Sequence, residues 1–183
     1  NLYINKERGK NMKFVLEPRG YANKCFTIKD IDVKPEETVV NFDIPGHEKF
    51  SDIVRLRNVF KQFPNVQTLI IGPNILNIEI SNLMFPNVKK VISSNKHFAS
   101  NVPYLIEIQR KDRILKNVFF KGKDESIDMA DITKIGPYVF EGCMSTDFVN
   151  ISENLIMYDS FQQNVLSGSM LVLKESKEGI VAF

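Results

Sequence analysis

The sequence predicts an α/β-type repeat solenoid that is mostly β, with short helical or irregular returns and a small β-rich cap at its N-terminal end. Two independent spacings predict it. Phe-Pro-Asn-Val occurs at 63–66 and again at 85–88, 22 residues later. A small or aliphatic residue followed by Phe recurs at 139–140, 160–161 and 182–183, at spacings of 21 and 22. Units this short cannot bury their own apolar side, so we expect them to stack with their strands aligned in a parallel sheet.

Each unit should contribute one strand and one return segment. The Phe-Pro-Asn-Val copies lead into β-prone runs, and two further runs follow the same period in the C-terminal half. Two irregularly spaced runs in the middle of the chain flank the charged residues 110–113, and they fit either a hairpin or two irregular units. The expected strands are residues 68–71, 90–93, 104–109, 117–121, 148–152 and 170–174. Together they define a solenoid over residues 51–183, and residues 179–183 open a unit that we expect to continue beyond this chain.

Residues 1–50 lie outside the repeats. Residues 40–44 alternate apolar and polar side chains, as a half-buried strand does, and residues 24–33 form another strand-like run. Pro35, Pro45 and Gly46 mark turns between them. We interpret this region as a β-rich cap, because an uncovered solenoid end would expose apolar surface.

Composition excludes several classes of protein. The chain has 183 residues, of which 43% are hydrophobic and 25% charged, which is typical of a folded globular protein and not of a disordered one. A formal net charge of +2 is too balanced to require a nucleic-acid partner. The sequence has no apolar run of about 18 residues, the length that predicts a membrane span.

The sequence predicts no catalytic or metal site, and hence no enzyme and no cofactor. His47 and His97 have no Cys or His neighbour at ligand spacing, and we expect both to be surface loop histidines. Cys25 and Cys143 can form at most one disulfide bond and lack metal-site spacing. An acidic stretch lacks the residue order of a calcium loop, so we interpret it as a solvated loop; it comprises Asp124, Glu125, Asp128 and Asp131.

Residues 127–143 resemble one repeat of leucine-rich-repeat proteins of the BspA-like type, I-x-x-I-G-x-x-A-F-x-x-C-x-x-L-x-x-I-x-[IL]-P. Ile135-Gly136, Val139-Phe140 and Cys143 match the core of that unit, although Val stands where the family has Ala. The following matches are Val149, Ile151, Ile156, Ser160, Phe161, Leu171 and Leu173, with Asn164 at the Cys position. The resemblance covers residues 53–183. It implies a leucine-rich-repeat solenoid of bacterial, cell-surface or secreted origin, which acts through protein–protein interaction and has no catalytic residues of its own.

The alternation of strands predicts an exposed face on the repeat sheet. If Leu69, Ile71 and Val91 point inward, their neighbours point outward. The predicted binding residues are then Ile70, Ile92, Phe119, Asn150 and Val172 in the central row, flanked by Phe148 and Met170. Most of the central row is apolar, and an exposed apolar stripe commonly marks a contact surface. The alternatives are plain β propensity or cover from the cap.

We therefore predict a non-catalytic module that binds a protein or glycan ligand as a monomer, with no nucleic acid and no membrane span. The alternative is an accessory or structural domain of a larger enzyme whose catalytic part lies elsewhere in its chain. A hydrolase would need a cleft that brings His47 or His97 to a nucleophile.

Overall fold

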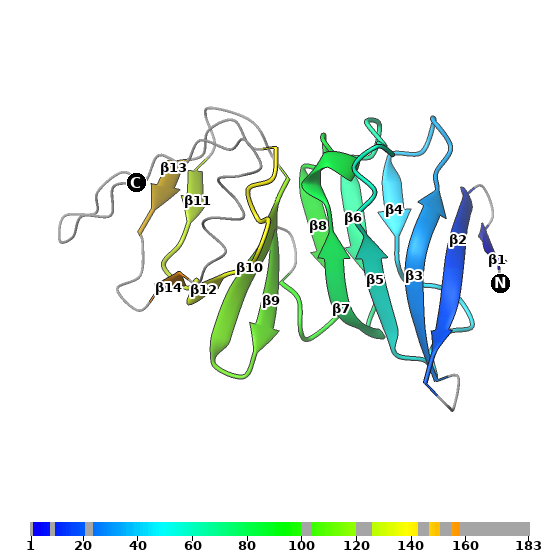
Figure 1. Ribbon diagram of the computed structural model, residues 1–183, viewed down its shortest axis with the longest axis horizontal. Coiled ribbons are helices and arrows are strands. Elements are labelled where there is room, and N and C mark those ends of the chain that lie inside the picture. Colours follow the sequence, from blue (N-terminus) through cyan, green and yellow to red (C-terminus); the bar gives the residue numbers. More distant parts are fainter. Residues whose placement is uncertain are drawn as a thin grey trace.

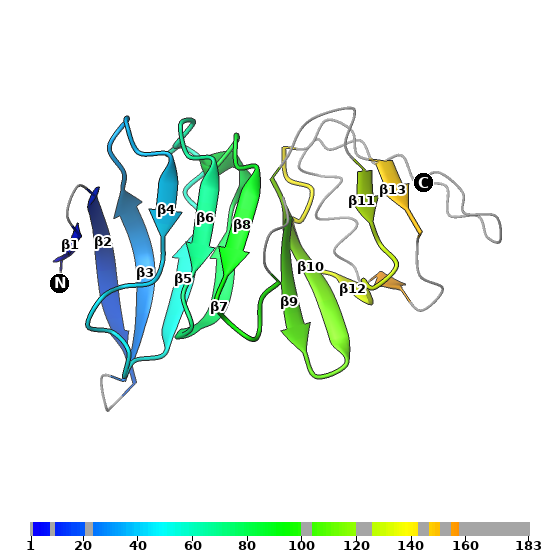
Figure 2. The same ribbon diagram turned by 180° about the vertical axis from the view of Figure 1, so that it is seen from behind.

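A computed structural model describes residues 2–7, 10–20, 24–99, 104–119, 126–142, 147–150 and 155–157, and the structural statements below concern these residues. The strand predicted at 170–174 and the Phe pairs at 160–161 and 182–183 lie outside them. The described residues form a β-rich solenoid built from two stacks of coils (Figures 1 and 2). None of its described helices is long and apolar enough to cross a membrane.

The first stack contains three coils, and each coil places one strand in each of two sheets (Figures 1 and 2). β3, β5 and β7 pair in parallel in one sheet, and β4, β6 and β8 pair in parallel in the other. The strands are β3 (Cys25–Asp32), β4 (Val39–Asn41), β5 (Asp52–Leu56), β6 (Thr68–Ile71), β7 (Ile75–Ile80) and β8 (Lys90–Ser93). A coil thus holds two strands, where the sequence predicted one strand and a return.

At the N-terminal end, only one sheet continues past the coils. β1 (Leu2–Glu7) and β2 (Lys10–Arg19) form an antiparallel pair, and β2 pairs with β3. The resulting sheet has the order β1-β2-β3-β5-β7. The cap predicted for residues 1–50 is therefore not confirmed, since β3 and β4 already pair with the next coil of the stack.

The second stack begins with a hairpin of β9 (Tyr104–Gln109) and β10 (Asp112–Val118), which answers the question left open by the sequence. Parallel strands then continue it in two sheets, with the orders β14-β12-β10-β9 and β11-β13. These strands are β11 (Ser126–Asp128), β12 (Lys134–Ile135), β13 (Asp147–Val149) and β14 (Ile156–Met157). A 3₁₀ turn in the first stack, η1 (Asn82–Met84), is the only helical element among the described residues, so of the helical or irregular returns that the sequence allowed, the helical ones are almost absent there.

The repeated Phe-Pro-Asn-Val motif stacks one coil on the next. The Phe63 and Phe85 rings stack with centroids 5.6 Å apart. The Asn87 side chain donates to the Pro64 carbonyl oxygen over 2.8 Å, and Asn65 donates in the same way to Pro35 of the preceding coil. Val66 and Val88 are both buried. The second copy thus packs on and bonds to the first, and the register Thr68↔Lys90 has the same 22-residue spacing.

Two residues hold the turn between β6 and β7 in place: Gly72, which lies in the turn, and Asn95, which follows β8. A Cβ on Gly72 would lie 2.8 Å from Cα of Asp43, so only glycine fits where this turn crosses the coil beside it. The buried Asn95 amide donates to the carbonyl oxygens of Gly72, Pro73 and Ile75 over 3.0, 3.3 and 2.6 Å. Two of these carbonyls belong to the turn between β6 and β7, and the third belongs to the first residue of β7, so one side chain from the next coil satisfies all three.

The two stacks have separate apolar cores that meet at their junction. Leu105 of β9 and Phe119, which follows β10, extend into the core of the first stack. Leu115, Ile135, Val139 and Phe140 belong to the core of the second stack. The Val-Phe pair at 139–140 is fully buried, as its place in the repeat predicts.

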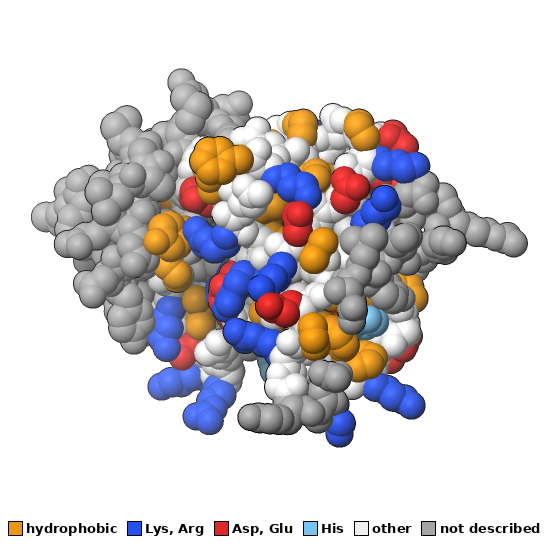
Figure 3. All heavy atoms as spheres, turned by 45° about the vertical axis from the view of Figure 1, so that its right-hand side comes forward, with side chains coloured by type: hydrophobic (Ala, Val, Ile, Leu, Met, Phe, Trp, Pro, Cys, Tyr) orange, Lys and Arg blue, Asp and Glu red, His pale blue; other side chains and the backbone are white. Residues whose placement is uncertain are grey.

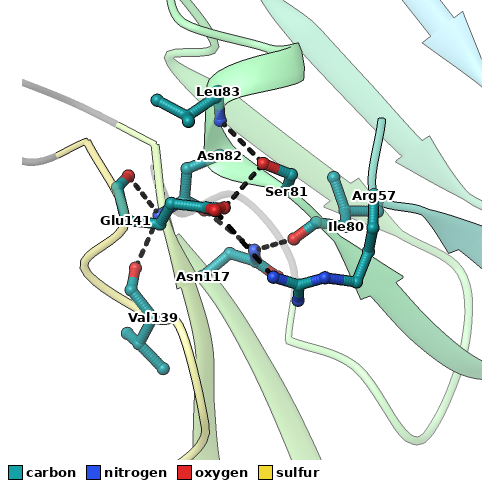
Figure 4. A network of polar contacts seen from close by, with 8 residues as sticks. All are labelled: Arg57, Ile80, Ser81, Asn82, Leu83, Asn117, Val139 and Glu141. Carbon is teal, nitrogen blue, oxygen red and sulfur yellow. Dashed lines mark hydrogen bonds and ion pairs between the residues drawn. The ribbon is translucent and has the colours of Figure 1, made fainter. Parts of the chain in front are cut away.

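A buried polar network also joins the stacks (Figure 4). The Asn82 side chain donates to the carbonyl oxygens of Val139 and Glu141, and Asn117 donates to the Ile80 carbonyl and to Asn82 Oδ1. The Ser81 hydroxyl donates to Glu141 Oε2 over 2.6 Å. These contacts hold the turn at residues 137–142 against η1, where no strand ladder of the described residues connects the stacks.

Arg57 closes the network at the surface. Its guanidinium lies 3.9 Å from Glu141 Oε1 and stacks on the Tyr138 ring at 4.2 Å from the centroid (Figure 4 shows Arg57 and Glu141). Tyr138 has a φ of 57°, a left-handed conformation that is uncommon for residues other than glycine. The cation–π contact and the buried carboxylate therefore hold a strained turn in place.

Candidate functional site

The outer face of the β4–β6–β8 sheet carries two rows of side chains that run across the coils. In this parallel sheet Asn41 pairs with Ile70, and Ile70 pairs with Ile92. The neighbouring row consists of Val39, Thr68 and Lys90. Ile70 and Ile92 are half-buried side by side, and they form an aliphatic pair in the middle of the face.

Alternation along the strands positions this pair. Leu69, Ile71 and Val91 point inward and are at most 1% exposed, so the residues between them must point outward. The inward side chains pack in the core of the first stack, which fixes the backbone of β6 and β8. The outer face is thus a rigid surface whose rows follow directly from the register.

The outer face of the opposite sheet has a different chemistry. Arg55 and Glu79 form an ion pair at 2.8 Å across β5 and β7, and Lys29 and Glu17 form another across β3 and β2. In Figure 3, Lys and Arg side chains lie next to Asp and Glu side chains in the middle of the visible surface. Ion pairing already satisfies these charges, whereas the Ile70–Ile92 pair has no polar group to satisfy.

The other predicted binding residues do not join Ile70 and Ile92. Phe119 is 1% exposed and packs in the core of the first stack, so its prediction as an exposed residue is wrong. The error arose because the last residue of β10 is Val118, so the strand alternation assumed for Phe119 does not apply. Asn150 is exposed and donates to Asp128 in the second stack. Met170, Val172 and the side chain of Phe148 lie outside what the structure describes.

His47 is not the surface histidine that the sequence predicted. It is 8% exposed, and its Nδ1 lies 3.0 Å from Oδ2 of Asp52, the first residue of β5. The rings of Phe26 and Phe50 pack against it with centroids 5.3 and 4.9 Å away. The one sequence signal of the His47–Asp52 pair is a histidine that lies five residues before an acidic residue at the beginning of a strand. His97 is exposed, as predicted.

Burial is the main cause of the pKa shifts around this pair. Burial raises the pKa of Asp52, although the hydrogen bond from His47 and the backbone N–H of Phe26 oppose the rise. Burial and the nearby Asp52 carboxylate also raise the pKa of the free Cys25 thiol. A thiol with a raised pKa is a weak nucleophile, so Cys25 is not activated in the manner of a catalytic cysteine.

Within the described part of the chain, no cluster of three or more His, Cys, Asp or Glu side chains has the geometry to hold a metal ion. Asp128 and Asp131 of the predicted acidic loop are exposed, and Asp124, Glu125 and Cys143 lie outside the described ranges. Comparison with known proteins found no matching family model, no similar curated protein and no similar solved structure. The candidate site is the outer face of the β4–β6–β8 sheet, where the register places Ile70 beside Ile92.

Proposed function

We propose that this chain is a non-catalytic binding module that takes a protein ligand on the outer face of the β4–β6–β8 sheet. The observation that carries the proposal is the Ile70–Ile92 pair, two aliphatic side chains set side by side by the parallel register and left half-buried. Folding does not require these outward positions to be apolar, because the inward row already fills the core.

The surroundings of the pair support a protein ligand over a glycan. A protein interface has an apolar centre with a polar rim. Here Ile70 and Ile92 form the centre, and Asn41, Thr68 and Lys90 form the rim, with hydrogen-bonding groups of both kinds. The rigid backing of the sheet lowers the entropy that binding must overcome.

Elsewhere among the described residues, the most exposed large apolar side chains give no comparable surface. Val15, Phe60, Leu76 and Tyr138 are exposed by 36% or more, but each lies on a different element. Isolated exposed apolar residues are normal on protein surfaces. Ile70 and Ile92 differ because the hydrogen-bonded register makes them neighbours.

A more specific proposal is that the module belongs with leucine-rich-repeat proteins of the BspA-like type. The support is the sequence resemblance around Ile135, Val139 and Phe140, together with a repeat arrangement of parallel strands. The two strands in each coil of the first stack depart from the single strand of such a repeat. In that setting the module would be part of a bacterial surface or secreted protein.

A matched pair of variants tests the proposed face. Ile70→Glu with Ile92→Glu places two charges on it, and Ile53→Glu places one on the opposite sheet, where Ile53 is also half-buried and outward. The wild-type protein is used to isolate a partner, which is purified, and its Kd for each variant is measured by calorimetry. We expect the double variant to bind at least about tenfold more weakly and Ile53→Glu to bind as wild type.

Circular dichroism and thermal unfolding show whether the variants fold. If the double variant is folded and binds the partner with wild-type affinity, the ligand does not use this face. If both substitutions at positions 70 and 92 unfold the protein, the face is part of the core and the proposal fails.

A further inference from the structure

We propose that the outer edge of β4 is a strand-addition site, at which an extended segment of a partner protein pairs with the backbone of residues 39 and 41. This surface is distinct from the outer face of the sheet. It uses backbone groups of one edge strand, and it does not depend on the Ile70–Ile92 pair.

The hydrogen bonds between β4 and β6 show which backbone groups are unused. The Thr68 N–H donates to the Thr38 carbonyl over 3.1 Å, and the Phe42 N–H donates to the Ile70 carbonyl over 2.9 Å. In a parallel ladder, the backbone N–H and C=O groups of every second residue point toward the partner strand, so those of residues 38, 40 and 42 point toward β6. The N–H and C=O groups of Val39 and Asn41 therefore point away from β6.

No strand pairs with that side of β4 among the described residues. The sheet has the order β4-β6-β8, so β4 is an edge, and no backbone hydrogen bond joins Val39 or Asn41 to another described segment. The opposite sheet continues past β3 through β2 and β1. Figure 2 shows β4 in front as the last strand of its sheet, with β2 and β1 extending farther toward the N-terminus in the layer behind.

Two donors and two acceptors on alternate residues of an extended strand match one kind of ligand, which is another extended backbone. Strand addition provides affinity through main-chain hydrogen bonds and specificity through alternate side chains. β4 has only three residues, so it is too short to stack copies into a long sheet, yet it offers four hydrogen-bonding groups.

The interior next to β4 restricts the side chains of the added segment. Val40 and Phe42 are at most 1% exposed, and the Phe42 ring lies 6.3 Å from that of the fully buried Phe14. A side chain that points inward from the added strand meets this closed core, so it must be small. The outward side chains continue the rows that begin at Val39 and Asn41, where larger residues are accommodated.

The occupant is a partner segment and not a second copy of this chain. Two three-residue edges placed against each other bury far less than the roughly 1,200 Å² of a specific dimer interface. A free peptide segment can follow β4 beyond its ends, and its side chains can reach the outer face as well.

Proline at position 39 tests the edge without breaking the ladder. The Val39 N–H points away from β6, and edge strands tolerate proline at such positions. A peptide is selected against the wild-type protein from a displayed library of random 12-residue sequences, and its Kd is measured. We expect Val39→Pro to weaken it at least tenfold and the control Val39→Ala to change it by less than threefold. Ile53→Glu, on the outer side of the opposite sheet, serves as a second control that should also leave the affinity unchanged.

Hydrogen exchange on the wild-type complex gives an independent readout that does not require the proline variant to fold. In the free protein the amides of residues 39 and 41 should exchange rapidly and those of 40 and 42 slowly. Bound peptide should protect 39 and 41. Three outcomes would each overturn the proposal. The peptide binds folded Val39→Pro with unchanged affinity, the protection does not alternate between residues, or the wild type forms a dimer that Val39→Pro abolishes.

Discussion

Ser81 and Glu141 lie in different stacks, and the Ser81 hydroxyl donates to Glu141 Oε2 over 2.6 Å in a buried setting. The same hydroxyl oxygen accepts the Leu83 N–H and so caps η1. One side chain thereby fixes the end of a turn in the first stack and holds the 137–142 turn of the second. This relationship makes the junction specific, because a carboxylate buried there without the hydroxyl would lose a charge-assisted hydrogen bond.

Ser81→Ala should lower the free energy of unfolding by about 1.5–3 kcal/mol, the range for a hydrogen bond to a charged group. The same substitution in a Glu141→Ala background should cost less, because the acceptor is already gone. Urea denaturation of the four proteins measures the coupling. Ser93→Ala is the matched control, since Ser93 bonds within the first stack, and it should show no coupling to Glu141. Strictly additive losses for Ser81 and Glu141 would show that the bond does not join the stacks.

Asn95→Ala should destabilise the protein by about 2–3 kcal/mol, since it leaves buried carbonyl groups of the β6–β7 turn without their donor. Asn87→Ala is the comparison, because that side chain is exposed and donates to Pro64 alone. We expect it to cost no more than about 1 kcal/mol in the same urea experiment. Equal losses for the two variants would mean that burial of the Asn95 amide contributes nothing.

Asp52→Asn should change how stability depends on pH. The folded-state pKa of Asp52 is raised by burial, so the native state holds a proton that the unfolded state releases at lower pH. The stability that wild type gains from this group is therefore complete in acid and is lost as pH rises through the folded-state pKa. The substituted amide does not titrate, yet its oxygen can still accept from His47. The stability of Asp52→Asn relative to wild type should thus increase from pH 3 toward neutral pH.

Urea unfolding of the Asp52→Asn variant and the wild type at a series of pH values measures this difference. Asp43→Asn, on the exposed turn after β4, controls for the loss of a carboxylate and should change stability by less than about 0.5 kcal/mol. A wild-type advantage that grows with pH would show that Asp52 is stabilised as the charged form, which contradicts the effect of burial argued above.

The sequence predicted best the strands that follow a repeated local motif, Phe-Pro-Asn-Val. Residues 68–71 and 90–93 form β6 and β8 with the expected ends, and their register reproduces the 22-residue spacing. The prediction succeeded because the same contacts, Phe63 on Phe85 and Asn87 on Pro64, select the same residues in each coil. The inward and outward assignment of Leu69, Ile70 and Ile71 follows from alternation alone, and the structure confirms it.

The exposure of the candidate site residues was harder to predict, because it depends on which other segments pack against their strand or turn. Phe119 follows the last residue of β10 and packs into the core of the neighbouring stack, which no periodicity within its own segment indicates. His47 looked like a loop residue because Pro-Gly-His marks a turn. Its burial depends on Phe26, from a strand about twenty residues earlier, and on Phe50.

The sequence by itself determined the repeat, its period and the strands that follow Phe-Pro-Asn-Val, since these features arise from interactions that every coil makes with its neighbour. Only the tertiary structure decided that each coil of the first stack carries two strands, that β9 and β10 form a hairpin, and that Ser81, Asn82, Asn117 and Glu141 meet at the junction. Such contacts join residues that are far apart in the chain and occur once. A single sequence contains no second copy from which to recognise them.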